Sequence, residues 1–125
     1  MARATATSER ISEIDGALLA RMVRAGTARL RAHAQEVNDL NVFPIPDGDT
    51  GSNMLLTASG GADSITDTED GIGHTARRIS DGMLLSARGN SGVILSQIFE
   101  GMAQALDGAD AADSALLIRA MQSGL

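Results

Sequence analysis

The 125-residue chain has 43% hydrophobic but only 2% aromatic residues, a composition that suits one modest, mainly helical domain. Ten basic residues against sixteen acidic ones give a net charge of -6, which opposes binding to the phosphate backbone of a nucleic acid. All ten basic residues are arginine and cysteine is absent, which excludes a P-loop lysine, a lysine Schiff base, a cysteine nucleophile and a cysteine-bound zinc.

The first ten residues are polar and no apolar segment follows them. We therefore expect residues 1–10 to be a flexible tail and not a signal peptide, and residues 11–125 to form the domain. No apolar run approaches the roughly 20 residues that cross a bilayer. Together with the absence of cysteine, this predicts a cytoplasmic protein without a membrane span.

The first predicted element is an amphipathic helix over residues 14–37, where apolar residues recur every three or four positions with arginine between them. Asp15 can cap this helix or favour its first turn. A loop over residues 41–51 follows, because Pro44 and Pro46 disfavour helical geometry and glycines allow tight turns. Proline and glycine constrain the geometry of this loop more than that of any other predicted loop in the chain.

Four further helices are predicted after this loop, over about residues 52–65, 72–87, 93–106 and 111–121, with a polar turn at residues 89–92 opening the fourth helix of the chain. The pair Gly60 and Gly61 is expected to weaken the second helix, and an acidic linker at residues 66–70 separates it from the third. Asp110 or Asp113 introduces the last helix. The predicted fold class is therefore all-α, an antiparallel helical bundle.

Asp47 and Asp49 lie two positions apart in the glycine-broken loop, where both carboxylates can converge on one hard cation such as magnesium. Taken alone, the segment is more often an ordinary turn. A calcium-binding EF-hand is disfavoured because Gly51 supplies no ligand. A haloacid-dehalogenase phosphatase is disfavoured as well, since two prolines interrupt the strand that should precede its aspartates.

Residues 89–92, Gly-Asn-Ser-Gly, join the third and fourth predicted helices. Backbone amides at a helix start favour phosphate oxygens, and Arg88 can add a charge-assisted contact. The alternative is a plain turn in which Asn90 or Ser91 caps the helix. An acidic loop and an anion-binding helix start in one small domain are the two halves of a metal–nucleotide site.

Two segments then carry a specific resemblance, residues 40–54 (LNVFPIPDGDTGSNM) and residues 87–99 (ARGNSGVILSQIF). Both resemble the signature segments of the DhaL family, the nucleotide-binding unit of dihydroxyacetone kinases. The chain is most similar to the branch at the N-terminus of bacterial fatty acid kinases. The resemblance spans residues 14–106 and implies a closed, antiparallel bundle of eight helices that binds ATP or ADP at one end through two magnesium ions.

The resemblance also implies roles for individual residues. Asp47 and Asp49 match metal-binding aspartates, and Asn41 stands where classical members carry a third aspartate. The positions that match the phosphate-binding residues of the family are Thr50, Gly51, Asn53, Asn90, Ser91 and Gly92. Arg88 and Gly89 complete the predicted nucleotide site. His33 and His74 lie in no motif, so surface or capping roles are expected and no catalytic side chain is assigned.

The implied function is phosphoryl transfer, either to a fatty acid carboxylate presented by a separate acyl-carrying protein or to dihydroxyacetone. The other hypothesis is a helical interaction module that keeps the motifs without turnover. Only about five of the eight family helices are predicted in this chain, so we expect the domain to be truncated, with its adenine contacts in the missing C-terminal part. In that case Ile94, Ile98, Leu116 and Ile118 should be partly uncovered.

Overall fold

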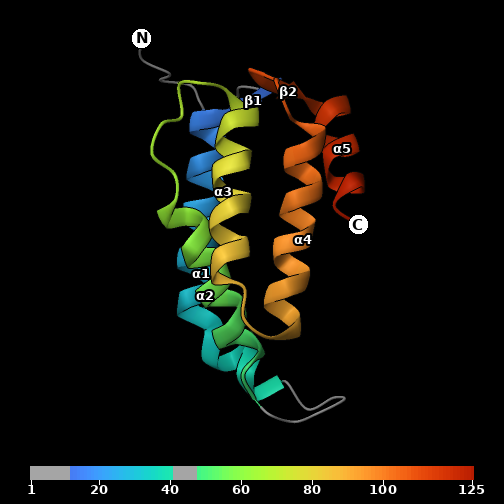
Figure 1. Cartoon of the computed structure of the whole chain (residues 1–125). Coiled ribbons are helices and arrows are strands. Elements are labelled where there is room, and N and C mark those ends of the chain that lie inside the picture. Colours follow the sequence, from blue (N-terminus) through green and yellow to red (C-terminus); the bar gives the residue numbers. More distant parts are fainter. Residues whose placement is uncertain (1–11, 41–47) are drawn as a thin grey trace.

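Five packed helices and one short two-stranded ribbon form the computed structural model, which describes residues 12–40 and 48–125 (Figure 1). The elements in chain order are β1 (Glu13–Asp15), α1 (Gly16–Leu40), α2 (Thr50–Asp63), α3 (Ile72–Ser86), α4 (Gly89–Ala105), β2 (Ala111–Asp113) and α5 (Ser114–Ser123). The all-α prediction is confirmed. The predicted tail at residues 1–10 lies outside the described residues, as do residues 41–47 of the predicted loop.

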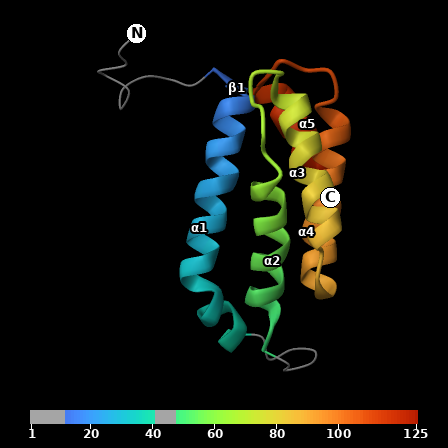
Figure 2. The same cartoon turned by 60° about the vertical axis from the view of Figure 1, so that its left-hand side comes forward.

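The helices run alternately down and up the bundle, and α3 lies at its centre. The first helix packs against α2 and α3, α4 packs against α2 and α3, and α5 packs against α4 (Figures 1 and 2). The apolar stripe of α3 supplies the middle of the core through Ile72, Ile79 and Met83, which are almost fully buried. This stripe repeats every three to four residues, as the sequence predicts.

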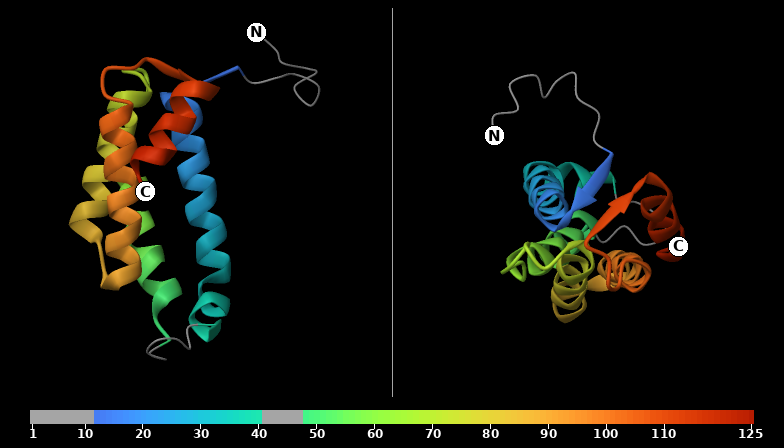
Figure 3. Two further views of the ribbon diagram at one scale, coloured as in Figure 1. Left: turned by 90° about the vertical axis from the view of Figure 1, so that its right-hand side faces the viewer. Right: turned by 90° about the horizontal axis from the view of Figure 1, so that it is seen from above.

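The ribbon, which the sequence did not predict, joins the upper ends of α1 and α5 (Figure 3). Its strands are antiparallel, with Ile14 opposite Ala112. Ala112 is buried against the core, so the pairing fixes where α5 begins. Asp113 caps α5 by accepting a hydrogen bond of 2.8 Å from the Leu116 amide, and Asp15 accepts one of 2.8 Å from the Leu18 amide in α1.

Glycines let the C-terminal halves of α2 and α3 approach closely. A Cβ on Gly82 would collide with the Gly60 carbonyl oxygen and with Ser64, and a Cβ on Gly61 would lie 2.6 Å from the Met83 side chain. The pair Gly60 and Gly61 does not end α2, which continues to Asp63. The expected weakening of this helix was based on the low helix propensity of glycine alone. The close packing of α2 against α3 requires residues without side chains at these positions.

A polar network connects α3 to α4 beside the apolar core. Glu100 accepts hydrogen bonds from Arg77 (2.6 Å), Ser80 (3.0 Å) and Gln104 (2.9 Å). The hydrogen bond from Arg77, followed by that from Gln104, lowers the pKa of Glu100 from 4.5 to about 2. The network therefore holds a charged carboxylate between the two helices at neutral pH.

This pKa shift predicts a pH dependence of stability. Because the folded state binds the Glu100 proton more weakly than the unfolded state does, the stabilisation is complete above pH 4.5 and is lost as pH falls toward about 2. Glu100→Gln should lower the free energy of unfolding by about 1 kcal/mol at pH 7 and by progressively less at acidic pH. Urea unfolding from pH 7 to pH 2.5 measures this difference. The matched control is Glu69→Gln, in an exposed turn, and an equal effect of both changes would contradict the prediction.

An apolar groove of about 530 Å³ lies between α1 on one side and α4 and α5 on the other. Figure 3 shows the course of these three helices. Its lining includes Met22 and Leu30 from α1, Ile98 and Met102 from α4 and Met121 from α5. Ile94 and Ile118 are 57% and 55% exposed, and Ile98 and Leu116 are partly buried, so all four apolar residues are at least partly uncovered, as expected. No helix in the described ranges is long and apolar enough to cross a membrane.

Candidate functional site

The starts of α2 and α4 lie at the same end of the bundle, the lower end in Figure 1. The first and third helices run down to this end, and the two segments that follow them turn back into α2 and α4. The predicted residues 49–53 and 88–92 are therefore brought to one end, although the whole of α3 lies between them in the sequence. The described residues of the two motifs therefore lie side by side at this end.

Asn53 and Gly89 form the direct contact between the two segments. Gly89 has φ +68, a left-handed conformation that favours glycine, and a Cβ at this position would collide with the Asn53 side-chain amide. Gly92, one turn further along α4, is buried against Thr57 and the Asn53 carbonyl oxygen. These two glycines allow α4 to begin directly beside the first turn of α2.

The two helix starts at this end have N-cap residues whose side chains form no capping hydrogen bond, Asp49 for α2 and Arg88 for α4. The expected alternative, a cap by Asn90 or Ser91, is wrong, because both residues lie inside the first turn of α4. At the upper end, by contrast, aspartates cap α1 and α5, and carbonyl oxygens of residues 109 and 110 accept from the first amides of α3. Apart from the Ser52 amide, which donates to the Asn38 side chain, the amides of the lower helix starts are thus better suited to an external anion.

Asn38, in the last turn of α1, supports the start of α2 and was not predicted as part of the site. Its side-chain oxygen accepts a hydrogen bond of 3.0 Å from the Ser52 amide, and its amide nitrogen donates one of 3.0 Å to the Ser52 hydroxyl. Gly51 is buried next to it, and a Cβ at this position would collide with the Ala34 carbonyl oxygen. An asparagine near a helix end has no distinctive sequence signal, since it is equally common as a simple terminator.

The predicted site residues differ in exposure. Asp49, Arg88, Gly89 and Asn90 are exposed, Thr50, Asn53 and Ser91 are half-buried, and Gly51 and Gly92 are buried. The exposed residues are accessible to a ligand, while the buried glycines set the approach of the helices. The predicted metal ligands Asn41 and Asp47 lie outside the described residues.

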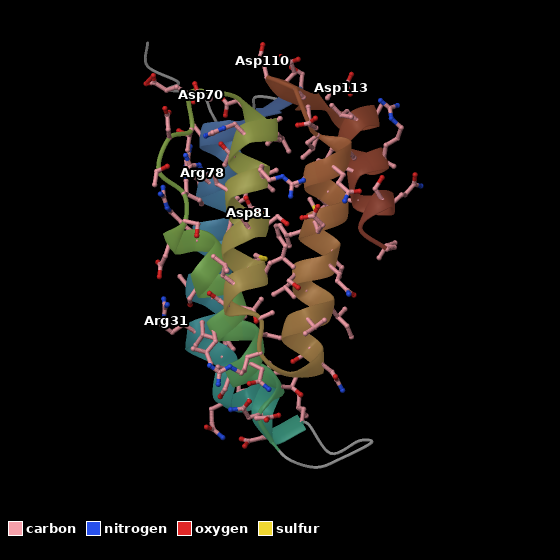
Figure 4. The ribbon with its side chains drawn as sticks, viewed as in Figure 1. Arg31, Asp70, Arg78, Asp81, Asp110 and Asp113 are labelled. Atoms are coloured by element: carbon pink, nitrogen blue, oxygen red, sulfur yellow. The ribbon has the colours of Figure 1, made fainter. Side chains whose placement is uncertain are left out.

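Acidic side chains gather at the opposite end of the bundle. Asp70, Asp110 and Asp113 lie at the upper end, around the start of α3 and the ribbon (Figure 4). These carboxylates are separated from the lower end by most of the bundle length. Salt would therefore screen their repulsion of an anion placed at the lower end. His33 and His74 each lie beside a carboxylate, Glu36 at 3.1 Å and Asp70 at 3.9 Å, as surface histidines do.

Magnesium prefers hard oxygen ligands, and the Asp49 carboxylate at the start of α2 fits that preference. It is the only predicted metal ligand among the described residues, where no cluster of three or more His, Cys, Asp or Glu side chains occurs. Asp49 alone does not make a magnesium site, so the predicted site needs the two ligands at positions 41 and 47.

Comparison with known families decides which class of protein this is. A family model described as the DAK2 domain matches residues 44–125, about two thirds of the chain and most of both motifs. The chain belongs to the DAK2 domain family. DAK2 domains are the nucleotide-binding part of DhaL-type kinases, so the resemblance expected from the motifs is confirmed at the level of the domain.

Staphylococcal proteins are similar to the DAK2 chain over most of its length. An uncharacterized protein of Staphylococcus saprophyticus is 47% identical over 98 residues, which cover 78% of this chain and 18% of that protein. An uncharacterized protein of Staphylococcus aureus is 42% identical over 116 residues, which cover 92% of this chain and 21% of that protein. The chain spans about a fifth of the length of the curated relatives it matches.

Proposed function

We propose that this DAK2 chain binds the phosphates of ATP or ADP, together with magnesium, between the starts of α2 and α4. The main support is the contact of Asn53 with Gly89, which joins two helix starts that no N-cap side chain occupies. Amides at both starts can donate to phosphate oxygens, and the helix dipoles favour the negative charge. Membership of a nucleotide-binding family makes a nucleotide the expected anion.

In this proposal Asp47 and Asp49, with Asn41, hold the magnesium, and Thr50, Gly51 and Asn53 approach the phosphates from α2. Arg88, Gly89, Asn90, Ser91 and Gly92 approach them from the start of α4. Magnesium would neutralise the phosphates and the charge that develops on them during transfer. Orientation by the two helix starts is the other contribution of the chain, and no side-chain nucleophile is required.

The proposed reaction transfers the terminal phosphoryl group of ATP to an acceptor oxygen. The oxygen attacks the γ-phosphorus, the bond to the bridging oxygen breaks, and ADP leaves. The motif pattern favours a fatty acid carboxylate presented by a separate acyl-carrying protein, which would give an acyl phosphate. Dihydroxyacetone is the second acceptor to be tested.

Calorimetric titration with ADP and ATP, with and without magnesium, tests the proposed site. Assays of ADP formation with each acceptor then test transfer. We expect nucleotide binding that requires magnesium, and turnover with one acceptor class. Absence of binding would contradict the proposal and favour a non-catalytic helical interaction module. Binding without turnover would limit the role of this chain to holding the nucleotide.

We also propose that additional helices cover the apolar groove in a longer protein and complete the adenine contacts. An uncovered groove of this size should bind a hydrophobic dye and promote self-association. Dye fluorescence and sedimentation of this chain, beside a chain extended to the family length, measure both effects. We expect several-fold stronger dye fluorescence from the shorter chain. Equal fluorescence and a monodisperse monomer in both cases would contradict the proposal.

A further inference from the structure

Thr57 lies outside both motifs, one turn after Asn53 in α2, and is completely buried. Its hydroxyl donates a hydrogen bond of 2.9 Å to the Asn53 carbonyl oxygen and accepts one of 3.3 Å from the Arg88 amide. Gly92 packs directly on the same hydroxyl oxygen. One oxygen atom of α2 therefore contacts the turn before α4 and the first turn of α4.

The bond to Arg88 distinguishes Thr57 from the other buried threonines. Within the part of the chain that the structure describes, the Thr27 hydroxyl bonds only to the carbonyl oxygen of Val23 in its own helix, at 2.8 Å, which is ordinary behaviour for a helical threonine. Thr75, also completely buried, has a hydroxyl without a hydrogen-bond partner among the described residues. The Thr57 hydroxyl alone among these three connects two elements of the candidate site.

We infer that Thr57 is a positioning residue that holds the turn at Arg88 and Gly89 against Asn53, so that both helix starts face the same phosphates. The inference rests on the proposed function and names a residue beyond the motifs. Phosphate recognition by backbone amides depends on their placement to within a fraction of an ångström. Without the hydroxyl, the Arg88 amide loses its partner and the turn is free to shift relative to α2.

Thr57→Val tests the role in the full 125-residue chain, since valine keeps the shape of the side chain and removes the hydroxyl. We expect affinity for magnesium–ADP to fall roughly three- to tenfold, the effect of one lost hydrogen bond. Thr57→Ser restores a hydroxyl and should restore most of the affinity. Thr75→Val is the matched control, because it makes the same change at a buried threonine at the other end of the bundle.

Thermal melting of each variant separates positioning from general stability. The inference predicts that Thr57→Val weakens nucleotide binding when it is measured at a temperature well below the melting temperature of the variant. Thr75→Val should leave binding unchanged at the same temperature. Equal affinity of Thr57→Val and the parent chain would overturn the positioning role and leave the proposed function intact. An equal loss in both valine variants would overturn it as well. Failure of the parent chain to bind magnesium–ADP would overturn the proposed function, and this role with it.

Discussion

Replacing Asp49 by alanine is expected to abolish magnesium-dependent nucleotide binding, with a loss of affinity of more than roughly a hundredfold. Asp49 ends the loop that carries the proposed metal ligands and lies at the start of α2, beside the proposed phosphate position. Removing its carboxylate leaves the cation with one charged ligand, Asp47. If the cation is held as proposed, loss of the Asp49 carboxylate would release the cation and the nucleotide together. Calorimetry with magnesium–ADP measures the effect.

Asp63→Ala provides the control for Asp49→Ala. It removes the same charge from an exposed position at the other end of the same helix. We expect its affinity for magnesium–ADP to equal that of the parent chain. Asp47→Ala should behave like Asp49→Ala. Unchanged affinity in both Asp47→Ala and Asp49→Ala would contradict the assignment of the metal loop.

The second large effect is expected at the contact of α2 with α3. Gly82→Ala should lower the free energy of unfolding by about 1–3 kcal/mol or more, because the added methyl group meets the Gly60 carbonyl oxygen and Ser64. A backbone oxygen cannot rotate away as a flexible side chain can, so the two helices must move apart. Urea unfolding followed by circular dichroism gives the difference.

Gly26→Ala is the matched control, since Gly26 lies within α1 and a Cβ there has no atom within 4 Å. Here the same change should stabilise the chain by up to about 1 kcal/mol through helix propensity. The two substitutions therefore have opposite predicted signs. Equal effects would show that the close approach of α2 and α3 contributes nothing to stability.

The sequence predicts the helices well because each buries an apolar stripe of helical period. It does not reveal why glycine stands at positions 60 and 61, since helix propensity describes an isolated helix and the contacts that these glycines allow are made with a different segment. The three-residue strands of the ribbon are too short to show a period. They form because α1 and α5 begin next to each other at the upper end.

The sequence likewise predicts only part of the candidate site. The two motifs could be found because glycine, asparagine and aspartate follow one another in a specific order, and the topology then explains how residues 53 and 89 meet. Asn38 and Thr57 could not be found, because each acts through hydrogen bonds to one residue of another segment, Ser52 for Asn38 and Arg88 for Thr57. Such contacts leave no pattern in one sequence. The ligand roles of Asn41 and Asp47 remain predictions from the motif.

The location of the nucleotide is the central claim, and amide chemical shifts measured during a titration with magnesium–ADP test it most directly. The proposed site predicts that the largest shifts occur at residues 49–53 and 88–92, with small shifts around Ile72 and Asp113 at the opposite end. The shifts at residues 49–53 and 88–92 should disappear when magnesium is removed. Shifts concentrated along the apolar groove or at the upper end, or no shifts at saturating nucleotide, would contradict the claim.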